Sequence, residues 1–246
     1  MSHSVESFAL RPGRRIGRRY RVERLLGAGT EGEVYRICED KTGVRRAAKI
    51  FFPQRDPDRR LSVSHARKLH RLRDCPIVLQ YFHSEEVTIR GYKTTAVISE
   101  LCEGEPLERW IEGARGQRWA VYPAMVLLRE LAIGLEQIHG LGQYHSDVHT
   151  ENILVTPRGV RLELKLIDFY EWGRPTRAKM REDIVQAVRV FYDVVGGAAH
   201  YAKLPQVAKN ICCGLKRSLI LQRFPTASSL RVHLETFHSD PVRYPI

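Results

Sequence analysis

The segment His145–Leu154, together with Leu166–Phe169, constrains this chain of 246 residues more than any other feature. It places Asp147 in a polar turn before a short apolar run, and Asn152 follows five positions later. Asp168 stands near the end of the next apolar run. Carboxylate and amide oxygens are ligands that a hard cation such as Mg²⁺ prefers, and a carboxylate can also accept a proton from a hydroxyl. The spacing indicates metal-assisted phosphoryl transfer, although Asp and Asn in loops are also ordinary turn formers.

A glycine-rich segment near the beginning of the chain adds a phosphate-binding signal. Its pattern is G-x-G-x-x-G-x-V, and glycines let backbone N–H groups approach phosphate oxygens without a Cβ in the way. The turn of a dinucleotide-binding unit would need a helix directly after the glycines, whereas residues 34–37 have the composition of a strand. The motif residues are Gly27, Gly29, Gly32 and Val34.

A single lysine interrupts the apolar strand predicted over residues 46–51. Such a lysine either extends its amine to the surface or reaches a phosphate from the strand. Lys49 lies 22 positions after Gly27, which favours the phosphate.

Taken in order, the glycine-rich loop, the strand lysine, the Asp and Asn of the polar turn and the later D-F pair resemble the protein kinase family. The resemblance extends over nearly the whole chain from about Tyr20. It implies an α+β fold with two lobes and a shortened activation segment. The expected parts are a basic N-terminal tail (1–18), a β-rich N-lobe (19–103) and a helical C-lobe (104–246).

The resemblance also implies ATP and Mg²⁺ as cofactors and gives each motif residue a role. Asp147 would orient the attacking hydroxyl and accept its proton, while Asn152 and Asp168 would hold Mg²⁺. Lys49 would neutralise charge on the α and β phosphates and completes the expected catalytic set. The adenine would contact apolar side chains and the backbone of the hinge between the lobes, at Val34, Ala47, Glu100, Cys102 and Leu154.

Two departures from the family's pattern concern how the charged groups are held. His65 aligns with the N-lobe helix position where the family has the Glu that pairs with the strand lysine. Asp56 or Asp58 could substitute, the nucleotide itself could position Lys49, or the pairing could be lost. Ser146 replaces the Arg that usually precedes the catalytic Asp, so the pocket that reads a phosphorylated activation loop is missing.

Two further departures concern the acceptor. Asp168 and Asp183 are 15 positions apart with no A-P-E sequence between them, and Tyr170 replaces the glycine of D-F-G. The platform for a peptide substrate is therefore largely absent. His149 stands where serine/threonine kinases usually have Lys, and the resulting D-x-H-x-x-N pattern resembles that of aminoglycoside and choline kinases.

The leading expectation is an ATP- and Mg²⁺-dependent phosphotransferase, a serine/threonine protein kinase acting on a protein hydroxyl. A small-molecule kinase of the aminoglycoside or choline kinase type and a nucleotide-binding pseudokinase scaffold are the alternatives. The formal net charge is +12, with arginines clustered between Arg11 and Arg24. Such a run is usually a solvated tail, and it could also bind an acidic partner. Tyr20 is its single aromatic residue, so beyond charge it gives little support for nucleic acid as a partner.

The remaining sequence features set the expected location and helices. The five cysteines have no C-x-x-C pair, and neither a secretory segment nor an apolar stretch long enough to span a bilayer is found, so we expect a cytoplasmic protein. Apolar spacing predicts helices over residues 64–72, 124–139, 183–195, 206–215 and 226–237.

Overall fold

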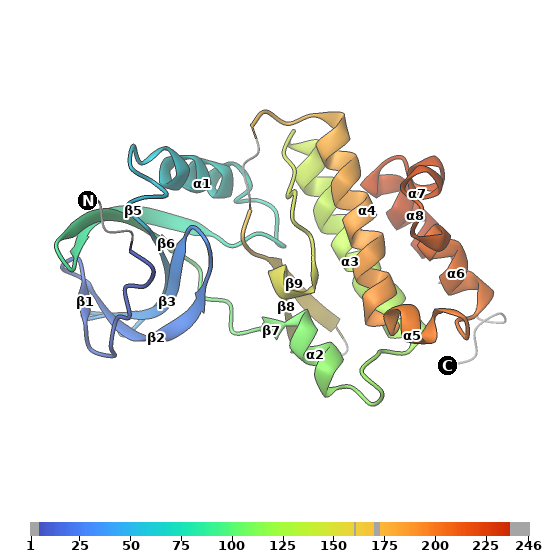
Figure 1. Cartoon of the computed structure of the whole chain (residues 1–246), viewed down its shortest axis with the longest axis horizontal. Coiled ribbons are helices and arrows are strands. Elements are labelled where there is room, and N and C mark those ends of the chain that lie inside the picture. The colour runs from blue at the N-terminus through green and yellow to red at the C-terminus, as the bar shows by residue number, and fades with distance from the viewer. Residues whose placement is uncertain (1–4, 160, 170–172, 237–246) are drawn as a thin grey trace. The chain divides into compact units, whose positions relative to one another are not determined.

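The computed structural model describes residues 5–159, 161–169 and 173–236 (Figure 1). These residues divide into two compact units. Unit 1 contains the chain up to Asp74 and Val78–Cys102, and unit 2 contains Cys75–Ile77 and the chain from Glu103 onward. The short segment Cys75–Ile77 groups with unit 2 because the carbonyl of Ile77 accepts the N–H of Leu166 at 2.7 Å.

Unit 1 is an antiparallel six-stranded sheet with one helix. The strand order is β1-β2-β3-β4-β6-β5, and helix α1 packs against β5 and β6. The elements are β1 (Arg15–Ile16), β2 (Tyr20–Ala28), β3 (Gly32–Glu39), β4 (Arg45–Phe51), α1 (Arg60–Arg71), β5 (Tyr81–Ile89) and β6 (Tyr92–Ser99).

Helix α1 begins four residues earlier than its apolar spacing predicted. The carboxylate of Asp56 accepts the backbone N–H of Leu61 at 2.9 Å and that of Ser62 at 3.3 Å. These bonds satisfy N–H groups of the first turn, which have no partner within a helix. An acid ahead of the helix therefore extends it beyond the apolar stripe.

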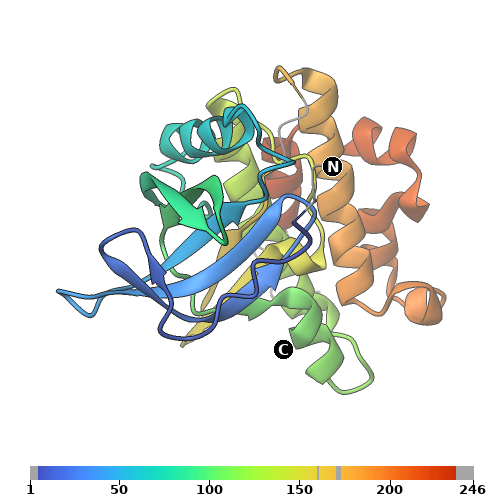
Figure 2. The ribbon, with the colours of Figure 1, turned by 60° about the vertical axis from the view of Figure 1, so that its left-hand side comes forward.

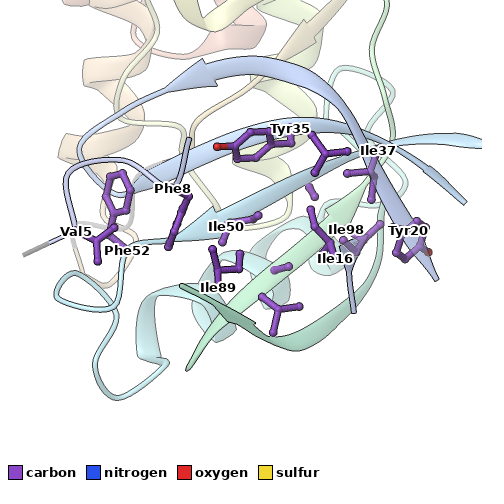
Figure 3. Close-up of a cluster of buried hydrophobic side chains, with 14 residues drawn as sticks. Val5, Phe8, Ile16, Tyr20, Tyr35, Ile37, Ile50, Phe52, Ile89 and Ile98 are labelled. Carbon is purple, nitrogen blue, oxygen red and sulfur yellow. The ribbon is translucent and has the colours of Figure 1, made fainter. Parts of the chain in front are cut away.

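The two faces of the sheet in unit 1 have different roles, because side chains alternate along a strand. Ala48 and Ile50 of β4 belong to the buried hydrophobic cluster drawn in Figure 3. Ala47, Lys49 and Phe51 alternate with them and therefore lie on the opposite face.

The N-terminal segment packs onto the cluster side of unit 1, which corrects the expected solvated tail for residues 5–16. Phe8 is 0% exposed and lies beside Phe52, with ring centroids 5.3 Å apart (Figure 3). Val5 and Ile16 are also buried. The arginines of this region are exposed, as expected. Their number made the segment resemble a solvated tail, although apolar residues lie between them and before them. Binding of an acidic partner by these arginines stays a prediction.

A buried carboxylate ties this segment to the sheet. Glu33 is 2% exposed and accepts hydrogen bonds from the Ser7 hydroxyl at 2.6 Å, from the Phe8 N–H at 3.1 Å and from the Tyr35 hydroxyl. The Tyr35 oxygen in turn accepts the N–H of Leu10 at 3.1 Å. Burial, followed by the bond to Glu33, raises the pKa of Tyr35 to about 12.

Unit 2 consists of helices and a small three-stranded sheet of order β7-β8-β9. Helices α3 and α4 pack against each other, and α8 packs on α3 (Figures 1 and 2). The elements are β7 (Glu105–Pro106), α2 (Leu107–Gly113), α3 (Val121–Gly140), η1 (Thr150–Asn152), β8 (Ile153–Arg158), β9 (Arg161–Leu166), α4 (Arg177–Val194), α5 (Gly197–Tyr201), α6 (Gln206–Cys212), η2 (Cys213–Leu215), α7 (Arg217–Arg223) and α8 (Ala227–Thr236).

The predicted helices of unit 2 exist with shifted boundaries. The helix predicted over residues 183–195 begins at Arg177, because the Thr176 side chain accepts the N–H of Lys179 at 3.3 Å and caps it. The helix predicted over residues 206–215 is interrupted at Cys213 and Gly214, which have φ of +49° and +59°. Phe237, the expected last residue of α8, lies outside the described residues. None of the helices in the described part of the chain is long and apolar enough to cross a membrane.

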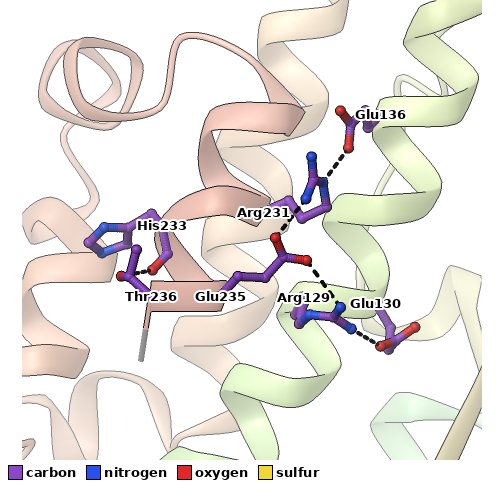
Figure 4. Close-up of polar contacts among 7 residues, drawn as sticks. All are labelled: Arg129, Glu130, Glu136, Arg231, His233, Glu235 and Thr236. Atoms are coloured by element: carbon purple, nitrogen blue, oxygen red, sulfur yellow. Dashed lines mark hydrogen bonds and ion pairs between the residues drawn. The ribbon is translucent and has the colours of Figure 1, made fainter. Parts of the chain in front are cut away.

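A network of ion pairs joins α8 to α3 (Figure 4). Arg231 lies 2.6 Å from a Glu136 carboxylate oxygen and 2.6 Å from Glu235, and Glu235 also pairs with Arg129 at 3.0 Å. The hydrogen bond from Arg231 lowers the pKa of Glu136 below its ordinary value of 4.5.

We predict that Phe8→Ala lowers the free energy of unfolding by about 3 kcal/mol, because a fully buried aromatic ring would be lost. Urea titration measures the change. Arg11→Ala, which removes an exposed side chain of the same segment, should leave the transition almost unchanged. Equal stability of the two variants would mean that the segment does not pack on the sheet.

We predict that Arg231→Gln lowers the midpoint of thermal unfolding at pH 7. The folded pKa of Glu136 is lowered, so the ion pair contributes stability above about pH 4.5 and loses it as pH falls through the lowered pKa. The difference between variant and wild type should therefore shrink between pH 5 and pH 3. Arg109→Gln, an exposed arginine on α2, is the control, and a difference that does not change with pH would contradict the assignment.

Candidate active site

The polar turn of unit 2 is held by hydrogen bonds along its backbone. His145 is 0% exposed, and the N–H of Asp147 donates to its Nδ1 at 3.2 Å. Since Nδ1 accepts, the proton of the neutral ring is on Nε2, which donates to the carbonyl of Ile167 at 2.9 Å. His145 therefore joins the residue before Asp168 to the turn that carries Asp147.

Helix α4 anchors the same turn through a fully buried carboxylate. One oxygen of Asp183 accepts the N–H of His145 at 2.8 Å and pairs with His139 Nε2 at 2.9 Å. Its other oxygen accepts the N–H of Ser146 at 2.7 Å. One helical turn further, the amide of Gln186 accepts from Val148 at 2.9 Å and donates to the Ser146 carbonyl at 3.2 Å. Sequence reasoning missed the last contact, although Asp183 and Gln186 share a helix face by their spacing.

The anchored backbone includes an unfavourable conformation. Ser146 has a φ of +75°, a region that residues with a Cβ rarely adopt. Such a conformation persists when its surroundings over-determine it, and here the bonds to Asp183 and Gln186 do so.

Asn152 is oriented toward the predicted catalytic carboxylate. Its Nδ2 donates to the Asp147 carbonyl at 3.0 Å and to Asp147 Oδ2 at 3.2 Å. Because the amide nitrogen is directed at Asp147, the amide oxygen is directed away from it. That oxygen, together with a carboxylate, is a hard donor set that suits Mg²⁺.

The hairpin of β8 and β9 places Asn152 and Asp168 at the same end. Ile153 pairs with Leu166, and the N–H of Ile167 donates to the carbonyl of Asn152 at 3.0 Å. Asn152 therefore lies just before the paired strands and Asp168 just after them. Asp168 has a φ of +55°, a second unfavourable conformation in this region.

The described residues contain no group of three or more His, Cys, Asp or Glu side chains placed to hold a metal ion.

His149 lies beside Asp147 on the exposed side of the turn. Its Nε2 is 3.5 Å from Asp147 Oδ2, and its Nδ1 is 3.9 Å from a carboxylate oxygen of Glu151. The position that drew attention in the sequence thus contacts the predicted catalytic group directly.

The segment between Asp168 and α4 is shorter than the sequence suggested, since α4 begins nine positions after Asp168. Tyr144 donates its hydroxyl proton to the carbonyl of Gly173 at 2.9 Å, and Lys179 donates to the carbonyl of Arg174 at 3.0 Å. Both bonds fasten the segment's end to unit 2. Tyr170 lies outside the described residues.

In unit 1, the glycine-rich loop joins β2 to β3. The N–H of Gly29 donates to the carbonyl of Gly32 at 2.9 Å, and Gly27 pairs with Val34 across the two strands. A Cβ on Gly32 would lie 2.1 Å from the Ile50 carbonyl oxygen, so only glycine fits there.

The predicted nucleotide contacts of unit 1 share one face of its sheet. Val34 is the register partner of Lys49, and Ala47 is that of Ser99. Side chains directly opposite each other lie on the same face, so Val34, Ala47 and Lys49 are brought together. After β6, the N–H of Glu100 donates to the Gln80 carbonyl at 2.8 Å, and Cys102 is the last residue of the unit. Leu154, in β8, belongs to unit 2.

The structure places a carboxylate beside Lys49 that sequence reasoning missed. Lys49 Nζ lies 2.8 Å from Glu31 Oε2 within the glycine-rich loop. Of the two proposed substitutes, Asp56 uses both carboxylate oxygens to cap α1, and Asp58 lies 3.9 Å from Arg60 at the surface. An acid inside the glycine-rich loop was the signal that could have identified this pair.

Comparison with known proteins gives a consistent result. A family model described as "Protein kinase domain" matches residues 20–186, more than half of the chain. Human myosin-IIIa is 30% identical over 168 residues, which cover 67% of this chain and 10% of that protein. Serine/threonine-protein kinase PknA of Mycobacterium tuberculosis (strain ATCC 25618 / H37Rv) is 28% identical over 162 residues, covering 65% of this chain and 36% of PknA. The chain therefore spans well under half of the length of these relatives.

A solved structure agrees over most of the chain. The Mycobacterium tuberculosis PknI kinase domain superposes with a TM-score of 0.65, covering 93% of this chain and 99% of that one at 18% identity. At this identity the likeness shows the fold.

We predict that Asp183→Asn destabilises unit 2 by about 3 kcal/mol. An amide nitrogen cannot accept the N–H groups that the buried carboxylate now accepts, so buried donors would lose partners. Urea titration gives the stability, and hydrogen exchange should show faster exchange at the amides of His145 and Ser146. Glu182→Gln, at the exposed neighbouring position on α4, should change neither measurement.

Proposed function

Because the chain belongs to the protein kinase domain family and has that family's α+β fold, both as its sequence predicted, we propose that it transfers the γ-phosphoryl group of ATP to a hydroxyl. The observation that supports this most directly is that Asn152 and His145 both form hydrogen bonds with Asp147 in the polar turn. Phosphoryl transfer depends mostly on positioning and electrostatic stabilisation, which a rigid turn of this kind supplies.

In this proposal, the carboxylate of Asp147 orients the acceptor hydroxyl and takes its proton. The bond from Asn152 Nδ2 holds that carboxylate in place. Bound Mg²⁺ would supply charge neutralisation at the phosphates, and Asn152 Oδ1 with the Asp168 carboxylate would hold it. In unit 1, Lys49 and the backbone N–H groups of the glycine-rich loop would bind phosphate oxygens.

We propose serine or threonine of a protein as the acceptor. The similarity to PknA, whose name gives it as a serine/threonine-protein kinase, supports this choice. A small-molecule hydroxyl is the second candidate, because His149 contacts Asp147 and α4 begins only nine positions after Asp168. So short a segment leaves little chain with which to hold a peptide.

We predict that Asp147→Asn lowers the rate of γ-phosphate transfer by at least about 10²-fold, because the general base is lost while the turn keeps its shape. Transfer of labelled phosphate from ATP to a generic protein substrate, and to the chain itself, is the measurement. Asp74→Asn, an exposed carboxylate paired with Arg73, is the matched control.

The same assay separates the other functions. Wild-type transfer no greater than that of Asp147→Asn would contradict the proposal and favour a scaffold that binds nucleotide without turnover. ATP consumption that appears with sugars, amino alcohols or aminoglycosides, and not with protein, would favour the small-molecule kinase.

A further inference from the structure

The pairing of Lys49 with Glu31 places the acid in the glycine-rich loop, on the chain segment that would cover the phosphates. The side chains are 13% and 16% exposed, so the pair is largely shielded from water and its attraction is stronger than that of a surface pair. The helix position that aligns with the family's usual acid is His65, on α1.

His65 cannot supply negative charge to Lys49. Its ring packs against Phe51, with ring centroids 5.8 Å apart, on the face of the sheet that carries Lys49. Burial, and then the charges of Lys49 and Lys68, hold the pKa of His65 well below its ordinary value, so the ring is neutral at physiological pH. The helix therefore presents a neutral ring where an anion would be needed.

The backbone around Glu31 is well fixed, which a positioning role requires. The carbonyl of Glu31 accepts the N–H of Phe52 at 2.8 Å, and the Gly29 N–H bonds to the carbonyl of Gly32 at 2.9 Å. Gly32, without a Cβ, allows the loop to lie directly on β4 at Ile50. Because these contacts hold the loop against the end of β4, they bring the Glu31 carboxylate close to Lys49 on the same strand.

We propose that Glu31 is the positioning residue for Lys49 in phosphoryl transfer, in place of an acid on helix α1. The inference rests on the function proposed above. An ammonium group has three N–H donors, so a bond to Glu31 is compatible with bonds from Lys49 to phosphate oxygens. Glu31 directs the amine of Lys49, and since Glu31 belongs to the loop, the loop and the lysine are positioned together.

The test uses the full chain and three variants: Glu31→Gln, the double variant Glu31→Gln/His65→Glu, and Glu23→Gln as a matched control. Glu23 is also an ion-paired carboxylate of unit 1, on β2, and it pairs with Arg45 rather than with Lys49. Calorimetry measures the affinities for MgATP and for adenosine, and labelled-phosphate transfer measures kcat/KM.

We expect Glu31→Gln to weaken MgATP binding by about tenfold and to lower kcat/KM by about tenfold or more, with adenosine affinity unchanged. A structural defect would weaken adenosine binding as well. The double variant should recover most of the loss, because His65→Glu places a carboxylate on the helix that faces Lys49. Glu23→Gln should match wild type.

Tighter MgATP binding by Glu31→Gln would overturn the proposal, since Glu31 would then be a competitor of the phosphates. Unchanged affinity and turnover, or a double variant no better than Glu31→Gln, would also overturn it. If the wild type transfers no phosphate, the proposed function fails, and the MgATP and adenosine affinities still decide whether Glu31 positions Lys49 toward a polyphosphate.

Discussion

The buried carboxylate of Asp183 is the interaction on which the geometry of unit 2's site depends. A charge removed from water must be met by hydrogen-bond donors, and here the donors are the backbone N–H groups of His145 and Ser146 together with His139. The electrostatic requirement of one side chain therefore fixes the backbone of the loop. This also explains how Ser146 sustains a positive φ, because relaxing it would separate the N–H from the carboxylate.

The residues bonded to Asp183 also fix the positions of other site residues. His145 bonds to the carbonyl of Ile167, and the hairpin of β8 and β9 fixes Asn152 relative to Ile167. Asp147 lies two positions after His145, and Asp168 lies directly after Ile167. Both His145 and Ile167 are held by hydrogen bonds. In the proposed mechanism, both carboxylates would therefore act without a large reorganisation of the backbone.

The sequence predicted the elements whose signals are local. Spacing alone predicts the glycines whose backbone position excludes a Cβ, such as Gly32. It also predicts that Lys49 lies on the face of β4 opposite Ala48 and Ile50. Helix beginnings were less predictable, because α1 and α4 are extended by the caps Asp56 and Thr176, which lie outside the apolar stripes.

Contacts between distant residues were not predictable from local pattern. Phe8 is buried against strands far along the chain, and the exposed arginines around it gave the opposite impression. The partner of Lys49 was sought on a helix, because the family's pattern places it there, whereas Glu31 is brought close by the fold of the loop. In both cases a side chain's environment is decided by residues that lie far from it in sequence.

The beginning of β3 shows how two carboxylates on either side of one glycine can have different surroundings, because Glu31 lies in the glycine-rich loop and Glu33 lies in β3. Glu31 and Glu33 flank Gly32, and the first meets Lys49 while the second is buried under the N-terminal segment. Glu33 would be a costly buried charge without the donors of Ser7, Phe8 and Tyr35. The N-terminal segment therefore supplies bonds that let β3 keep its position against β4, and the placement of Glu31 depends on that same position. The segment is part of the structure that orients the lysine, although none of its residues is predicted to touch a nucleotide.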